Sequence, residues 1–118
     1  MIIGDYGQIK GVLGLTPQEE QGAKDFMLGA VYCRCKNQNG EWFAVRDLFG
    51  GDNFDWGGTP LRVLYEKEKG KGKEDLEAID EAGKSAGRLL KKTLFENEKR
   101  SFESKKEGMT RKYKWVKG

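Results

Sequence analysis

The stretch that decides the expected fold is residues 79–116, IDEAGKSAGRLLKKTLFENEKRSFESKKEGMTRKYKWV. Helical periodicity runs up to Gly83, Ser85 is placed to cap a second helix, and a basic segment rich in β-formers follows at once. A single helix through both glycines is the alternative, but the turn and cap signals favour two. We therefore expect helices over 74–82 and 86–97, followed by a β-hairpin.

The hairpin is predicted from alternating residues around a glycine tip. Its strands are expected at Arg100–Ser104 and Thr110–Val116, with the tip at Lys105–Gly108. Three aromatic residues fall on one side of the predicted pair and should face the core: Phe102, Tyr113 and Trp115.

Charge is distributed unevenly along the chain. Residues 84–118 hold 12 Lys and Arg against 4 Asp and Glu, a net charge of +8, whereas residues 1–58 hold 5 against 8, a net of −3. Concentrated positive charge of this kind is typical of a surface that contacts an anion such as nucleic acid.

The remaining elements predict a small α+β fold in one domain, because 118 residues suffice for a single core. Thr16-Pro17-Gln18-Glu19 is a capping-box helix start, so a helix is expected over about 17–36, although 26–36 also reads as a strand. Thr59-Pro60 repeats the start signal for a short helix. The expected divisions are an irregular arm (1–15), a helix, a strand over Glu41–Leu48 and an aromatic loop (16–58), and a helix-turn-helix with a basic hairpin (59–118).

From Thr59 to Val116 the order helix, helix, glycine turn, helix, hairpin resembles winged helix-turn-helix DNA-binding domains. The resemblance implies that Ser85–Lys92 is the recognition helix, that Lys105–Gly108 is the wing tip, and that the strand at 41–48 pairs with the wing. It implies duplex DNA as partner. The residues expected to contact DNA are polar or cationic and lie on the helix and hairpin: Ser85, Arg88, Lys91, Lys92, Lys105, Lys106, Arg111, Lys112 and Lys114.

A second candidate site is the loop at 49–58, which packs aromatic residues beside aspartates. Asp52, Phe54, Asp55 and Trp56 are suited to a cationic or peptide ligand through charge and ring faces. This site supports the alternative function, a small accessory interaction protein that binds a protein or small ligand without catalysis, with a homodimer as a further option. Short chains of this kind resemble the accessory proteins of phages and other mobile elements.

Several classes of function lack support in the sequence. The chain has no His, so Ser-His-Asp and Cys-His pairs are absent, and no enzyme, metal or cofactor is expected. GKS at 83–85 lacks the earlier glycine of a phosphate loop, and Phe54 and Trp56 occupy ligand positions of the apparent calcium loop. Cys33 and Cys35 are expected as free thiols of a cytoplasmic protein with no membrane span.

Overall fold

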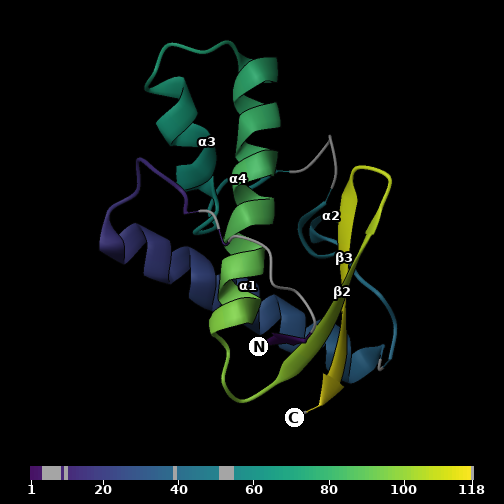
Figure 1. The fold of residues 1–118 in the computed structure, drawn as a ribbon. Helices are drawn as coiled ribbons and strands as arrows, with labels where there is room; N and C mark the ends of the chain where they lie inside the picture. The colour runs from purple at the N-terminus through teal and green to yellow at the C-terminus, as the bar shows by residue number, and fades with distance from the viewer. Residues whose placement is uncertain (4–8, 10, 39, 51–54, 118) are drawn as a thin grey trace.

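The computed structural model describes residues 1–3, 9, 11–38, 40–50 and 55–117, and they form a small α+β domain of four helices and a three-stranded mixed sheet. Figure 1 shows the elements in chain order, which are β1 (Ile2–Ile3), α1 (Pro17–Asn37), α2 (Val45–Phe49), α3 (Arg62–Lys69), α4 (Asp75–Glu96), β2 (Ser101–Glu107) and β3 (Thr110–Lys117). Among the described residues, no helix is long and apolar enough to span a membrane.

Helix α1 begins where the sequence predicts. The Thr16 hydroxyl accepts a hydrogen bond from the Glu19 N–H at 3.1 Å, and the Glu19 carboxylate accepts one from the Thr16 N–H at 2.9 Å. The strand alternative for 26–36 is wrong, because one helical stripe of buried side chains runs the length of α1: Ala23, Met27, Val31 and Cys35. Burial of this stripe outweighs the β-propensity of residues 30–35, AVYCRC.

Helix α4 is unbroken, so the predicted division at Gly83 is wrong. Gly83 and Gly87 each cost about 1 kcal/mol relative to Ala in a helix. The side chains that would have belonged to two helices form one continuous buried stripe: Ala78, Ala82, Ser85, Ala86, Leu89, Leu90, Thr93 and Leu94. Core packing along this stripe outweighs the two glycines. The helix-turn-helix boundary expected at this point is therefore absent.

The predicted strand at 41–48 is reduced to a single bridge. Phe43 pairs with Tyr113 of β3, with reciprocal N–H···O bonds of 2.8 Å, and its side chain is fully buried. The chain then turns into α2, because the Asp47 carboxylate accepts a hydrogen bond from the Ala44 N–H at 2.7 Å and stabilises the helix start. The alternation of apolar and polar residues over 41–48 predicts a strand, but only Phe43 in this segment pairs with another strand.

The C-terminal hairpin is confirmed. Strands β2 and β3 are antiparallel, with Phe102 opposite Trp115 and Ser104 opposite Tyr113. The strands are longer than expected and turn at Gly108-Met109, where Gly108 has φ +60°, so Lys105 and Lys106 lie in β2 and not at the tip. Phe102 and Tyr113 are buried, and Trp115 is partly buried against the same core.

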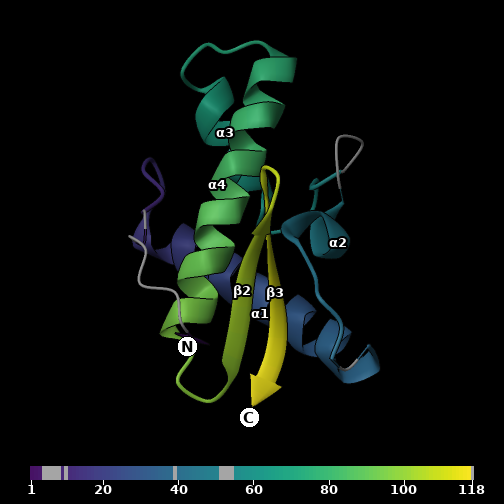
Figure 2. The same ribbon diagram turned by 45° about the vertical axis from the view of Figure 1, so that its right-hand side comes forward.

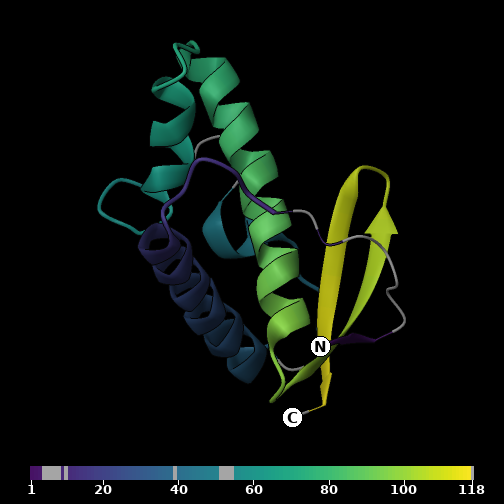
Figure 3. The ribbon, with the colours of Figure 1, turned by 60° about the vertical axis from the view of Figure 1, so that its left-hand side comes forward.

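The start of the predicted irregular arm is ordered as a third strand. Ile2 and Ile3 of β1 pair in parallel with Phe102 and Glu103, which gives the sheet order β1-β2-β3. The core lies where α1, the C-terminal half of α4 and the hairpin meet, as Figures 2 and 3 show from two sides. Helix α3 packs on the N-terminal half of α4, at the opposite end of the molecule from the two termini.

Candidate nucleic-acid interface

The helical part of the predicted interface is not assembled as expected. Ser85 is 3% exposed and lies inside α4, so its side chain cannot cap a helix or hold a phosphate at a helix start. The actual start of α4 carries Asp75 and Glu77 in its first turn, and their charge repels phosphate.

The predicted cations of α4 differ in their surroundings. Arg88 is exposed and Lys91 is half-buried. Lys92 forms an ion pair with Glu20 of α1 at 2.9 Å, and Lys24 of α1 pairs with Glu96 at 2.8 Å. Lys92 therefore serves to join the two helices.

The hairpin cations are divided between two faces by the alternation of β-strands. Phe102, Ser104, Tyr113 and Trp115 face the core. The opposite face, here named the outer face, carries side chains that are half-buried or exposed: Glu103, Lys105, Glu107, Lys112 and Lys114. Lys106 and Arg111 lie opposite each other on the core side near the tip, where Arg111 Nη1 donates to Ser104 Oγ at 2.8 Å.

An aromatic residue joins the outer face from outside the hairpin. Because Phe43 pairs with Tyr113 and points into the core, the preceding residue, Trp42, lies on the outer face. The ammonium nitrogens of Lys105 and Lys114 lie 4.3 Å and 5.2 Å from the centroid of its ring, within cation–π range. Trp42 and the two lysines thus form one cluster.

One carboxylate balances part of the outer-face charge. Lys105 and Lys112 are directly opposite on β2 and β3, a repulsive arrangement, and both form ion pairs of 2.9 Å with Glu107. Hydrogen bonding to Lys112, and then to Lys105, lowers the pKa of Glu107 to about 2. Glu107 is therefore ionised at neutral pH, and three lysines face two carboxylates on the outer face.

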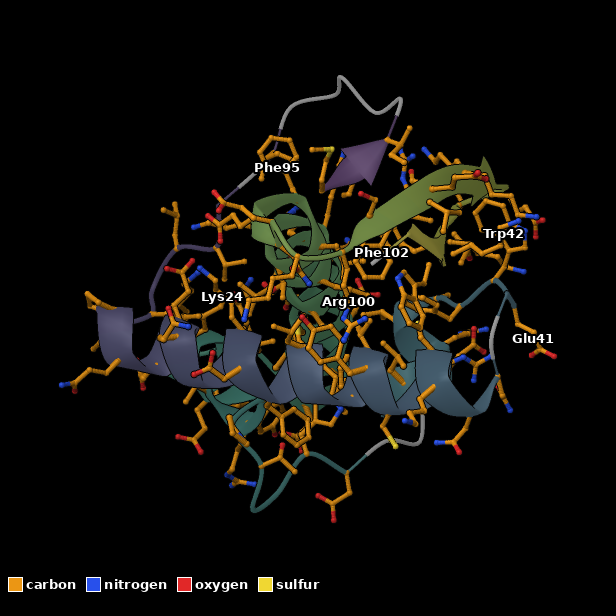
Figure 4. The ribbon with its side chains drawn as sticks, turned by 90° about the horizontal axis from the view of Figure 1, so that it is seen from below. Lys24, Glu41, Trp42, Phe95, Arg100 and Phe102 are labelled. Carbon is orange, nitrogen blue, oxygen red and sulfur yellow. The ribbon has the colours of Figure 1, made fainter. Side chains whose placement is uncertain are left out.

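Two labelled side chains mark the exposed side of α4 and the outer face of the hairpin. In the view from below, Phe95 projects from the exposed side of α4 while Trp42 lies beyond the hairpin at the far right (Figure 4).

The second predicted site is only partly within the described residues. Trp56 is buried, and its indole N–H donates to the carbonyl oxygen of Phe49 at 3.1 Å, so it anchors the loop. Asp55 is exposed and accepts a hydrogen bond from the Gly57 N–H at 2.8 Å. Asp52 and Phe54 lie outside the described residues. Trp56 therefore anchors the described end of this loop in the core.

The two cysteines are free and point to different environments, Cys33 to the surface and Cys35 into the core. Within the described ranges, no group of three His, Cys, Asp or Glu side chains is placed to hold a metal ion. Burial raises the pKa of the Cys35 thiol, against the effect of Arg34 and Arg100.

Sequence reasoning missed Trp42 and Arg100. Trp42 was assigned to a strand without a functional role, although the alternation of Trp42 and Phe43 implied opposite faces. Arg100 was expected only as the first residue of the hairpin. No sequence signal brings Arg100 to Tyr32, since the two are 68 positions apart.

Comparison with protein-family models, with curated proteins and with solved structures finds no match for this chain.

Proposed function

We propose that the protein binds nucleic acid, with duplex DNA as the first candidate, through the outer face of the hairpin. The observation that carries the proposal is the cluster of Trp42, Lys105 and Lys114. Lysines supply a salt-dependent attraction to phosphates, and an indole supplies a planar apolar surface for a base or sugar.

We keep the wing part of a winged-helix-like reading, although the unbroken α4 provides no helix-turn-helix. In that reading β2 and β3 form the wing, and the Phe43–Tyr113 bridge corresponds to the strand that pairs with it. Arg88 and Lys91 on α4 would then contact the phosphate backbone at the side of the wing. No residue of α4 is proposed to read bases, because its start is acidic.

The experiment is a titration of labelled duplex DNA at a series of salt concentrations. Affinity should fall as salt rises, with a log–log slope of about −0.9 for each phosphate neutralised. A single strand of the same sequence and heparin are measured in parallel. Heparin bound as tightly as duplex would show that charge alone decides binding and would contradict a specific interface.

Two double variants that lose the same charge test where the interface lies. The double variant Lys105→Ala with Lys114→Ala should reduce the magnitude of the log–log slope by the amount expected for about two phosphates. Lys69→Ala with Lys84→Ala, at exposed ion-paired sites on α3 and α4, should leave the slope unchanged. If both pairs weaken binding equally, the outer face is not the interface. If wild-type protein does not bind duplex at about 50 mM salt, the accessory-protein alternative replaces DNA binding.

A further inference from the structure

A small cavity lies on the core side of the hairpin base, between the hairpin and α1. It has a volume of about 190 Å³ and is lined by Tyr32, Cys35, Lys36, Arg100, Phe102 and Trp115. None of the outer-face residues lines it. Figure 4 shows Arg100 between the ribbon of α1 and the hairpin, at the position where the two elements approach.

Arg100 is held in this cavity by two aromatic rings. The central carbon of its guanidinium lies 4.2 Å from the ring centroid of Tyr32 and 4.8 Å from that of Trp115. Tyr32 is itself fixed, because its hydroxyl oxygen accepts a hydrogen bond from Asn97 Nδ2 at 3.0 Å. The guanidinium is therefore positioned in advance, with little rotamer freedom to lose when it binds.

Two buried donors at the cavity have no acceptor within the described part of the chain. They are Arg100 Nε and the indole Nε1 of Trp115. Leaving a buried donor unpaired is unfavourable, and it is more costly for a charged group. Because both residues line the same small cavity, a ligand bound there is one source of the missing acceptors.

The local charge specifies the sign of that ligand. No carboxylate of the described residues pairs with Arg100, and Lys36 adds a second cation at the cavity. A guanidinium cannot lose its proton at physiological pH, so the positive charge of Arg100 favours an anion in this cavity over a neutral or cationic ligand. The larger hollow between α1 and α2, about 370 Å³, has a carboxylate of its own, because Asp47 lines it together with Arg34.

The volume limits the size of the anion. Ligands of drug size occupy pockets of roughly 300–1,000 Å³, so a cavity of about 190 Å³ suits a smaller group. Planar N–H donors of Arg are matched by the oxygens of a carboxylate or a phosphate.

We infer that this cavity is a binding site for a small oxyanion, a phosphate or a carboxylate group, held by Arg100 and the indole N–H of Trp115. Lys36 supplies additional positive charge at the cavity. The site is separate from the outer face and does not depend on nucleic-acid binding. An oxyanion bound in this cavity connects α1 to the base of the hairpin.

The first test uses the two cysteines as paired reporters. Cys35 lines the cavity, whereas Cys33, two residues away, is exposed on another side of α1. Native protein is alkylated with increasing inorganic phosphate, with chloride holding the ionic strength constant. Labelling of Cys35 should slow about tenfold at ten times the dissociation constant, while labelling of Cys33 stays constant. Equal effects on both thiols would contradict a site at the cavity.

The second test uses thermal unfolding, which does not require Cys35 to be reactive. Phosphate or acetate should raise the midpoint of wild-type protein above that in chloride. The shift should be lost in Arg100→Gln and reduced in Trp115→Phe, which keeps the ring and removes the N–H. Lys99→Gln makes the same change in charge on an exposed neighbour and should keep the full shift.

The outcomes separate a small-anion site from its alternatives. A shift in phosphate alone assigns the site to phosphate, and a shift in acetate alone assigns it to carboxylates. Absence of both protection and shift at every concentration overturns the inference. Protection of Cys35 by duplex DNA but not by either small anion also overturns it, because the cavity would then belong to a nucleic-acid interface.

Discussion

The two faces of the hairpin use one kind of contact, a cation beside an indole, in different surroundings. On the outer face, Lys105 and Lys114 lie against Trp42 and an acid, Glu107, is at hand. On the core face, Arg100 lies against Trp115 with no acid beside it among the described residues. All three cations are half-buried and have lost part of their hydration, so the difference lies in the acid that one face provides and the other lacks. The outer-face cations are therefore partly balanced within the protein, whereas Arg100 is not balanced by any carboxylate of the described residues.

We expect the largest loss of stability when a core residue at the base of the hairpin is truncated. Phe102 is fully buried, lies edge-on to Phe43 and lines the cavity. Phe102→Ala should lower the free energy of unfolding by about 3–5 kcal/mol. The measurement is urea denaturation, with Phe95→Ala as control, because Phe95 is 48% exposed. Similar losses in the two variants would show that the hairpin base is not part of the core.

A buried charge with partners provides the reference for Arg100. Glu68 is 3% exposed and pairs with Lys67 at 2.6 Å, Lys71 at 3.4 Å and Lys73 at 2.5 Å. Hydrogen bonds from Lys67 and Lys73 lower its pKa to about 2. Glu68→Gln should cost about 1–3 kcal/mol at neutral pH, because the lysines lose their counter-ion.

The pH dependence of that loss follows from the direction of the shift. A carboxyl whose pKa is lowered on folding stabilises the native state above its unfolded value, near 4.5, and the contribution is lost as pH falls toward about 2. The difference between wild type and Glu68→Gln should therefore shrink over this window. Glu66→Gln, at an exposed i,i+4 pair with Arg62, is the control and should change stability little at any pH. A constant difference from pH 7 to pH 2 would contradict the assignment to Glu68 ionisation.

Matched substitutions on the two faces test the comparison itself. Arg100→Gln should cost about 1–2 kcal/mol in chloride, since a partly desolvated cation loses two ring contacts, and Lys105→Gln should cost less than about 1 kcal/mol. In phosphate the gap between the two variants should widen, because only Arg100→Gln loses the ligand. A gap that is the same in both buffers would indicate that Arg100 is purely structural.

The smallest expected effect concerns the acid on the outer face. Glu107→Gln leaves Lys105 and Lys112 without their partner and should change the unfolding free energy little, because the groups are exposed. The outer face then carries one negative charge fewer, so DNA affinity should rise a few-fold, roughly two- to fivefold. With the pKa of Glu107 at about 2, wild-type affinity should not respond to this group between pH 5 and pH 8. Weaker DNA binding by Glu107→Gln would contradict the outer-face proposal.

Sequence alone determined the features that depend on neighbouring residues. The capping box at Thr16 and Glu19 fixed the start of α1, and alternation around Gly108 fixed the hairpin with Phe102 and Tyr113 inward. Helical spacing separated exposed Cys33 from buried Cys35. These signals depend on residues only a few positions apart, so they can be recognised from the sequence.

Only the tertiary structure decided the features that depend on distant partners. Gly83 and Ser85 together give a local signal for a turn and a cap, but burial of the α4 stripe against α1, α3 and the hairpin keeps the helix continuous. Trp42 meets its lysines because Phe43 pairs with Tyr113, 70 positions away, and Arg100 meets Tyr32 across 68. Local propensities are worth at most about 1 kcal/mol per residue, and a buried side chain contributes about 1.5–3 kcal/mol. Packing therefore overruled the local pattern wherever the two disagreed, and it placed the charges of both candidate sites.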